Sequence, residues 1–281
     1  MYIESVNIIN LERRTDLEIA QRAVWTAMGA NEDRLRIHKA RDGLWFENRN
    51  QVCEQARDDG FDWFTDIDDE DLWMGVGELC CLWSISRLLR KIGHEGTEDH
   101  AYLYVLADRF SKKRLPYLEQ LFDRLPDFML FQFKGYVPHW DHLDRGDIKA
   151  SIPKEFLPGD DIIPSNQIQE GYTKHGDGVL GMTPAGARYM LQLAEEKYEF
   201  PVPYEIMLWH EGINNVCPKG VYSTICAEYD FSDESTEWEG EFPHPLAGWH
   251  ASDIGEANRQ TETGGYRNPN QALEQDWFQN E

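Results

Sequence analysis

The feature that most constrains the fold is an uninterrupted apolar run at residues 102–107. A strand without polar positions is typical of a sheet that is covered on both faces. Other segments rich in Val, Ile, Leu and Phe predict further strands at residues 2–11, 128–133, 178–182 and 221–227. The chain is therefore expected to build its core around one sheet.

Segments with apolar residues at helical spacing lie between these strands. The first begins at Thr15, which with Glu18 fits a capping box, and it is expected to stop at Gly29. Further helices are expected at residues 77–92, from Pro116 onward, and at residues 184–197. Alternating strands and helices predict an α/β protein with a mostly parallel sheet and helices on both faces.

Two predicted strand ends carry groups suited to a ligand. Arg13 and Arg14 follow the first strand, and Asp108 and Arg109 follow the run at residues 102–107. In parallel sheets ligands bind beyond the carboxyl ends of the strands. Arginine at a strand-to-helix turn favours anions, and a carboxylate can hold a metal or a ribose. Each pair alone has an ordinary structural explanation, whereas together they indicate a ligand with a nucleotide diphosphate.

Three common motifs are absent from the sequence. No GxGxxG follows the first strand, and neither GxxxxGK[ST] nor GxSxG occurs. Their absence disfavours dinucleotide dehydrogenases, P-loop NTPases and α/β-hydrolases.

The charge is strongly negative, since 27 basic and 51 acidic residues give a formal net charge of −24. Such a field repels nucleic acid unless positive charge is gathered locally. A basic hexad, residues 109–114, contains Arg109, Lys112, Lys113 and Arg114. The end of the chain is acidic, so we expect a folded domain at residues 1–227 and an acidic extension at residues 228–281.

The 5 cysteines are odd in number and form no CxxC motif. A disulfide framework or structural zinc is therefore not expected, and a reducing cytoplasm is the expected location. Apolar runs are much shorter than the roughly 20 residues that span a bilayer, so no membrane span is expected. The first residues lack the order of charged and apolar residues typical of a secretory signal.

Several blocks in order resemble one family. The opening VNIINLERRTDL, with KARDG at residues 39–43, resembles the start of the family 25 glycosyltransferases, the lipopolysaccharide-biosynthesis and procollagen galactosyltransferase-like enzymes. Later blocks are similar to that family's GEIGCxLSH helix, LILEDD strand end, dwDlllL strand, aYlIsrkGAkkLl block and PiDxxL segment; they lie at residues 77–84, 104–109, 126–130, 178–190 and 201–208. The resemblance covers about residues 6–225.

The resemblance implies a GT-A-like, Rossmann-type fold, a nucleotide-sugar donor, Mn²⁺ or Mg²⁺ as cofactor, and inversion at the anomeric carbon. Asp108 is the residue that it places at the metal. The residues that it places at the donor are Asn10, Arg13, Arg14, Asp42, Ser84, Asp108 and Arg109. The chain departs from the family where Ala107, Asp108 and Arg109 replace its paired acids. One carboxylate supplies few of the oxygen ligands that a hard cation needs, and Arg109 offers a fixed positive charge in place of the metal.

The expected activity is transfer of a sugar to a hydroxyl group of a glycan, lipopolysaccharide or other acceptor. Glu205 is the first choice for the base that deprotonates this hydroxyl, and Asp177 is the second. One alternative is transfer to hydroxymethylated bases of phage DNA, which requires the basic hexad and residues 87–91 to form one patch. A second alternative is a non-catalytic interaction module with a nucleotide-sugar-binding fold.

Overall fold

The structure is a computed structural model that describes residues 1–65, 74–107, 114–132, 168–171, 179–198, 200–214 and 216–224. Asp108, Arg109 and Asp177 lie outside the described residues, as do most of the basic hexad and the acidic extension. The division into a domain and an extension therefore stays a prediction.

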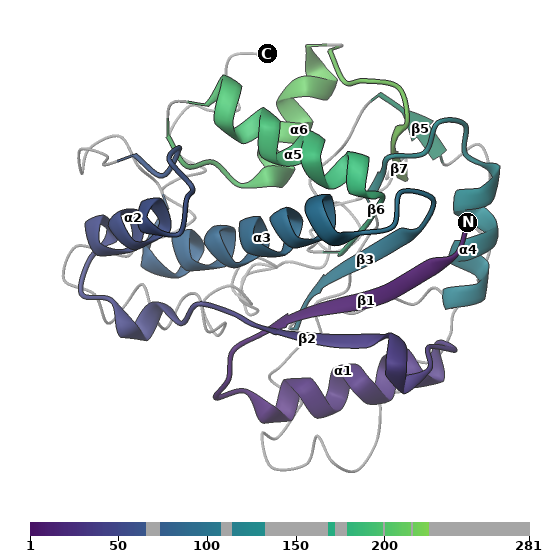
Figure 1. The fold of residues 1–281 in the computed structure, drawn as a ribbon, viewed down its shortest axis with the longest axis horizontal. Helices are drawn as coiled ribbons and strands as arrows, with labels where there is room; N and C mark the ends of the chain where they lie inside the picture. The colour runs from purple at the N-terminus through teal and green to yellow at the C-terminus, as the bar shows by residue number, and fades with distance from the viewer. Residues whose placement is uncertain are drawn as a thin grey trace, which may run out of the picture.

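A seven-stranded sheet forms the centre of the described chain, in the order β2-β1-β3-β6-β4-β7-β5 (Figure 1). Its strands are β1 (Ile3–Asn10), β2 (Leu35–Lys39), β3 (Ala101–Leu106), β4 (Leu130–Gln132), β5 (Ile168–Glu170), β6 (Val179–Met182) and β7 (Val221–Thr224). β2 and β5 are the edge strands.

The sheet is mixed. β1, β2, β3, β4 and β7 run in one direction, whereas β5 and β6 run in the other. Because β6 lies between β3 and β4, three of the six pairings are parallel and three are antiparallel. The expected α/β class is confirmed, but the expectation of a mostly parallel sheet is not.

Six α-helices surround the sheet in the described chain. They are α1 (Thr15–Ala27), α2 (Arg49–Asp58), α3 (Val76–Glu95), α4 (Leu115–Arg124), α5 (Pro184–Lys197) and α6 (Tyr204–Ile213), and two 3₁₀ turns are η1 (Glu32–Arg34) and η2 (Gly43–Trp45). The capping box predicted at Thr15 is wrong, because Arg14 is the N-cap of α1 and no side chain caps it. β2, α2 and α6 were not expected from the sequence, since their apolar residues are too few or too irregularly spaced.

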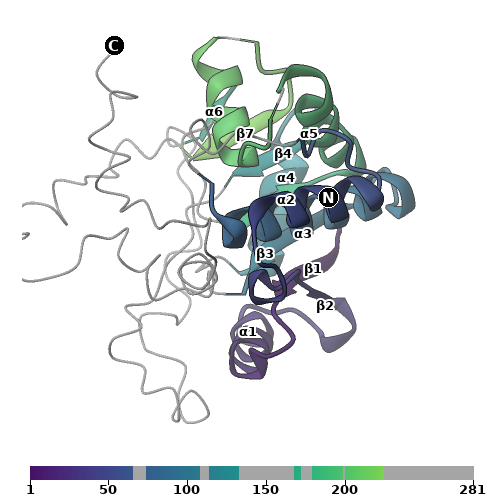
Figure 2. The same cartoon turned by 90° about the vertical axis from the view of Figure 1, so that its left-hand side faces the viewer.

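Helices cover both faces of the sheet, as expected. On one face α2, α3, α5 and α6 enclose a core that contains Trp83 and Tyr104. On the other face α1 and α4 enclose a second core that contains Trp25 and Leu103. Figures 1 and 2 show α1 and the pair α3–α5 on opposite sides of β1 and β3.

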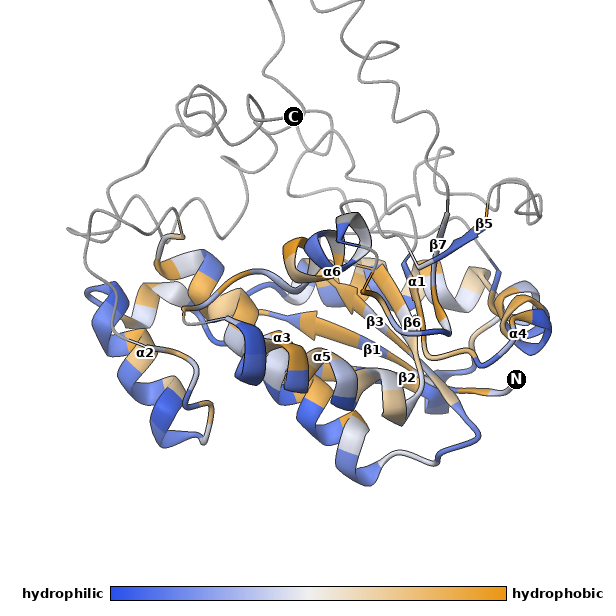
Figure 3. Cartoon of the chain, turned by 90° about the horizontal axis from the view of Figure 1, so that it is seen from above, coloured by the Kyte–Doolittle hydropathy of each residue, from blue (hydrophilic) through white to orange (hydrophobic). Residues whose placement is uncertain are grey.

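The alternation of β3 explains its apolar sequence. Leu103 and Val105 belong to the core under α1 and α4, whereas Tyr102 and Tyr104 belong to the core under α3 and α5. Successive side chains of a strand point to opposite faces, so both sets are buried. Figure 3 shows the central strands β1 and β3 as hydrophobic, next to helices that carry both hydrophobic and hydrophilic residues.

Local signals at three helix ends act as the sequence predicts. Gly29 follows α1 with a φ of 92°, in the left-handed region that favours glycine. Pro116 lies in the first turn of α4. Thr183 caps α5 by accepting a hydrogen bond from the Gly186 amide at 3.2 Å.

Two further observations concern the described chain alone. None of its helices is both long and apolar enough to cross a membrane. Its four cysteines, Cys53, Cys80, Cys81 and Cys217, form no disulfide.

Candidate functional site

The carboxyl ends of β1, β2 and β3 meet at one edge of the sheet, which we call the carboxyl edge. The amide of Ala40, just after β2, donates to the carbonyl of Asn10 at 2.8 Å. The amide of Ala107, just after β3, donates to the carbonyl of Ile9 at 3.0 Å. The segments that follow these strands therefore begin side by side, and Asp108 is the residue that comes directly after Ala107.

Arg13 and Asp42 come together at this edge. Arg13 Nε donates to Asp42 Oδ2 at 2.7 Å, and the carboxylate is buried. The other oxygen of Asp42 accepts a hydrogen bond from the amide of Leu44 at 3.1 Å and so caps η2. Asp42 is thus both a helix cap and the counter-ion of Arg13, which ties the loops after β1 and β2 together.

Arg14 has a carboxylate of its own. Its Nε and Nη2 donate to the two oxygens of Asp16 at 2.9 and 2.7 Å, a fork-like arrangement typical of strong arginine–carboxylate pairs. Burial acts to raise the pKa of Asp16, but hydrogen bonds and the charge of Arg14 outweigh it and hold that pKa below its usual value. Arg13 and Arg14, which the sequence predicts to bind phosphate, therefore each already form an ion pair with an aspartate in this structure.

Two buried carboxamides at the carboxyl edge have unmet hydrogen-bonding capacity. Asn10 ends β1; its Nδ2 donates to the carbonyl of Arg14 at 2.9 Å, but its Oδ1 has no partner. Gln132 ends β4, is 3% exposed, and neither of its amide atoms has a partner. A buried unsatisfied polar group costs about 1–3 kcal/mol, so such groups are rare in folded proteins and require a reason.

The two carboxamides lie on different faces of the sheet. Gln132 shares a face with Leu130, which packs in the core under α3 and α5. Asn10 shares a face with Ile8, which packs in the core under α1 and α4. The carboxyl edge therefore has on both faces a carboxamide with unmet hydrogen-bonding capacity, an acceptor oxygen on Asn10 and both a donor and an acceptor on Gln132.

Of the other predicted site residues, Ser84 has a positioning role. It lies on α3, where its Oγ donates to the carbonyl of Cys80 at 2.6 Å and accepts from the amide of Arg41 at 2.8 Å. This bond fixes the loop after β2 to α3. Glu205 lies in the first turn of α6, and its side chain is outside the described part of the structure.

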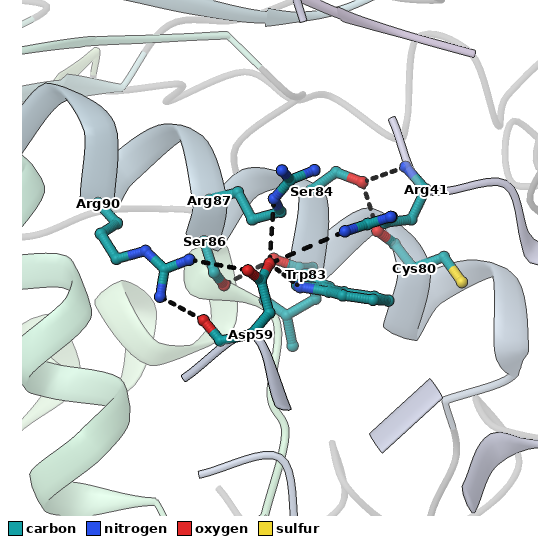
Figure 4. A network of polar contacts seen from close by, with 9 residues as sticks. Arg41, Asp59, Cys80, Trp83, Ser84, Ser86, Arg87 and Arg90 are labelled. Carbon is teal, nitrogen blue, oxygen red and sulfur yellow. Dashed lines mark hydrogen bonds and ion pairs between the residues drawn. The ribbon is translucent and has the colours of Figure 1, made fainter. Parts of the chain in front are cut away.

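A cluster that sequence reasoning missed joins α2 to α3; we call it the arginine cluster and define it as Arg41, Arg87 and Arg90 around Asp59 (Figure 4). Arg87 Nε lies 3.1 Å and Arg90 Nη2 3.2 Å from the carboxylate of Asp59, and Arg41 Nη2 lies 4.0 Å away. Trp83 Nε1 donates to the same carboxylate at 3.0 Å. The spacing of positions 83, 87 and 90 on one helix face was a signal, but their partner follows a helix that was not predicted.

Arg41 lies flat on an aromatic ring in this cluster. Its guanidinium carbon is 4.2 Å from the centroid of the Trp83 ring, and its Nε is buried without a hydrogen-bond partner. Burial and the neighbouring charge of Arg87 lower the pKa of Arg41, whereas Asp59 acts to raise it. Arg41 thus carries a charge that its surroundings balance only in part.

His38 on β2 lies in the same positively charged surroundings. Burial lowers its pKa from 6.5 to about 4, and the charges of Lys91, Arg36 and Arg87 add to this effect. The ring is therefore neutral at pH 7, and its Nε2 lies 2.9 Å from Asn7 Oδ1, to which it donates as a neutral imidazole.

Metal and nucleic-acid sites find little support among the described residues. Within them, no group of three or more His, Cys, Asp or Glu is arranged to hold a metal ion. Of the basic hexad only Arg114 is described; it begins α4, on the face of the sheet opposite to α3. Arg114 and residues 87–91 therefore do not form one patch.

Comparisons with family models and with curated proteins add no relative to this geometry. No protein-family model matches the chain, and no curated protein matches it.

Proposed function

We propose that the chain is a glycosyltransferase that moves a sugar from a nucleotide-sugar donor to a hydroxyl acceptor. The observation that carries the proposal is the carboxyl edge, where Asn10 is buried with an unmet hydrogen bond next to the Arg13–Arg14 loop, and where Gln132 is buried without partners at the end of β4. Ligands of α/β sheets bind at this edge, and a ligand would supply the missing bonds. The proposal includes a GT-A-like arrangement of the sheet.

The residue types suit the chemistry of such a donor. A carboxamide both donates and accepts hydrogen bonds, which matches sugar hydroxyls and nucleobase edges. Arginine charges suit the two phosphates of the donor. A nucleotide sugar combines both kinds of group in one molecule.

The blocks that resemble family 25 glycosyltransferases also support the proposal by their positions. Residues 6–10 lie in β1, residues 77–84 begin α3, and residues 104–106 end β3. Residues 179–190 lie in β6 and the first turns of α5. The end of β1, the start of α3, the end of β3 and the start of β6 thus lie toward the carboxyl edge, whereas the start of α5 lies at the opposite edge of the sheet.

In the proposed reaction the acceptor oxygen attacks the anomeric carbon as the bond to the diphosphate breaks, which inverts the configuration. The proton of the acceptor hydroxyl passes to a carboxylate, for which Glu205 is our choice and Asp177 the second. Arg13, Arg14 and Arg109 stabilise the negative charge of the departing diphosphate, and Asp108 contacts the ribose.

A divalent cation such as Mn²⁺ or Mg²⁺ would act as a Lewis acid on the diphosphate. The carboxylates of Asp16 and Asp42 at the carboxyl edge are engaged by arginine, so the described residues do not fit a metal site. No step of the proposed reaction therefore depends on a metal. The thiol state of the described cysteines fits a reducing location such as the cytoplasm.

A thermal-shift screen against UDP-, GDP- and other activated sugars, with and without Mn²⁺, tests the proposal. At least one donor is expected to raise the melting temperature, and donor hydrolysis or transfer is expected with that donor. Gln132→Met removes the unmet amide without changing the side-chain length, so it should raise the melting temperature of the ligand-free protein and reduce the donor-induced shift. Gln192→Met, the same change at an exposed position of α5, is the matched control.

Two outcomes would contradict the proposal. No shift with any donor would favour the non-catalytic module. A steep salt dependence of DNA binding, with transfer to modified bases, would favour the DNA-modifying alternative.

A further inference from the structure

The arginine cluster holds more positive than negative charge. Arg41, Arg87 and Arg90 share the carboxylate of Asp59, which also accepts the Trp83 N–H (Figure 4). The contact from Arg41 is 4.0 Å, which is too long for a hydrogen bond. The carboxylate of Asp59 accepts hydrogen bonds from Trp83, Arg87 and Arg90, and it offers Arg41 only a longer charge–charge contact.

Arg41 is the member of the cluster that is least well paired. Its Nε is buried without a partner, and its guanidinium carbon lies 4.2 Å from the centroid of the Trp83 ring. The side chains of Arg41 and Arg87 are 29% and 43% exposed, so both can reach a molecule in solvent. An anion between them would reduce the repulsion of two neighbouring like charges.

The positive charge extends beyond the cluster. Lys91 lies one turn after Arg87 on α3, and both act on His38 together with Arg36 of the edge strand β2. Such a concentration is notable in a chain with a net charge of −24. The described surface around His38 therefore favours anions locally, although the whole protein repels them.

The cluster lies across a loop from the carboxyl edge. Asp42 has an extended backbone, with φ −91° and ψ 119°, so the side chains of residues 41 and 42 point in different directions. Asp42 contacts Arg13 at the carboxyl edge, whereas Arg41 contacts Trp83 on α3. Two binding places separated by one loop can hold the two substrates of a transfer reaction.

We propose that Arg41 and Arg87 bind a phosphate group of the acceptor, so that the acceptor is a phosphorylated hydroxyl compound. Guanidinium groups pair with phosphate oxygens through two parallel hydrogen bonds, and a doubly charged phosphate suits a site with several arginines. The assignment to the acceptor rests on the proposed function, whereas the binding of phosphate does not.

Calorimetric titration with inorganic phosphate, at constant ionic strength, tests the site directly. The wild-type chain is expected to bind one phosphate, and Arg41→Gln and Arg87→Gln are each expected to weaken binding at least tenfold. The matched control is Arg188→Gln, because Arg188 is 44% exposed and paired with Glu98 away from the cluster. Absence of saturable binding, or equal losses in all three variants, would overturn the site.

Asp59→Asn gives a test of opposite sign. If the carboxylate competes with phosphate for the same arginines, its neutralisation should strengthen phosphate binding several-fold. Unchanged or weaker binding in a variant with a native circular dichroism spectrum would overturn the site. Arg87→Lys, which keeps the charge but loses the planar fork, should bind phosphate with an affinity between those of wild type and Arg87→Gln.

Competition separates this inference from the proposed function. A nucleoside diphosphate that raises the melting temperature should leave phosphate binding at the cluster unchanged, and the donor-induced shift should persist in Arg87→Gln. Displacement of phosphate by the nucleoside diphosphate would show that the anion is the donor's own, and would overturn the acceptor assignment. Failure of every donor in the thermal-shift screen would contradict the proposed function while leaving the phosphate titration intact.

Discussion

The carboxyl edge and the arginine cluster are both built from arginine and aspartate, but they balance their charges differently. At the edge, Arg13 contacts Asp42 and Arg14 contacts Asp16, so each cation has its own carboxylate. In the cluster three arginines share Asp59. A one-to-one pair holds two segments together, whereas a shared carboxylate leaves positive charge that a ligand can use.

The comparison predicts that loss of the shared carboxylate has the largest effect on stability. Asp59→Ala leaves three arginines close together and removes the acceptor of Trp83, so we expect the free energy of unfolding to fall by about 2–3 kcal/mol, the range for lost hydrogen bonds to a charged group. Urea unfolding measures this change. Asp62→Ala, at a nearby exposed position, should change stability by less than about 0.5 kcal/mol. Similar small effects of both variants would mean that Asp59 does not hold the cluster.

Acid should destabilise the fold through His38. The folded-state pKa of His38 is lowered from 6.5 to about 4, so the unfolded chain binds a proton in this range that the folded chain does not. Its contribution is complete above pH 6.5 and is lost as the pH falls toward 4. Between pH 7 and 4.5 the wild type should lose about 2 kcal/mol more than His38→Gln in urea unfolding. Parallel losses in the two proteins would show that burial and the positive neighbours together do not lower the pKa of His38.

At the carboxyl edge, Asp42→Ala should have a moderate effect. The change removes the cap of η2 and the counter-ion of Arg13, and each such loss typically costs about 1 kcal/mol. We expect a decrease of about 1–2 kcal/mol in urea unfolding. Asp42→Asn keeps a capping oxygen and should recover about half of the loss. A full loss in Asp42→Asn would assign the whole effect to the ion pair.

Asp16→Ala should have the smallest effect of the four. Asp16 is 28% exposed and lies in the first turn of α1, where its charge interacts with the helix dipole as well as with Arg14. The expected decrease is about 0.5–1 kcal/mol, and it should diminish in 0.5 M salt. A loss equal to that of Asp59→Ala would remove the distinction between paired and shared carboxylates.

Apolar periodicity predicted most of the core elements correctly. The run at residues 102–107 gave β3, and the patterns after Gly77 and Pro184 gave α3 and α5. These elements are buried on one or both faces, so their sequences record which side faces the core. Turn and cap residues such as Gly29 and Thr183 marked their ends.

Elements with mixed composition could not be predicted in the same way. β2 has the sequence LRIHK, and α2 has the sequence RNQVCEQARD. Edge strands and exposed helices keep many polar residues, so their periodicity is weak. Missing α2 also hid the position of Asp59, and the arginine cluster could not be assembled from α3 alone.

The site residues illustrate a second limit. Sequence reasoning selected Arg13 and Arg14 by their chemical type, but the pairing of Arg13 with Asp42 depends on where loops 11–14 and 40–42 meet, and that of Arg14 with Asp16 on the local start of α1. Gln132 was overlooked because a lone glutamine at a strand end has no motif. Its unmet hydrogen bonds exist only in the folded chain.

The reversed direction of β5 and β6 has a consequence for how such a protein can diversify. Because Val179 pairs with Val105 and Ile168 pairs with Thr224, both reversed strands begin at the edge where β3, β4 and β7 end. The chain that leaves the sheet at the end of β4 therefore enters it again, at the start of β5, on the same edge. Added length there costs little closure entropy and leaves both cores intact. A lineage can thus enlarge or replace one rim of the molecule while inheriting the rest unchanged.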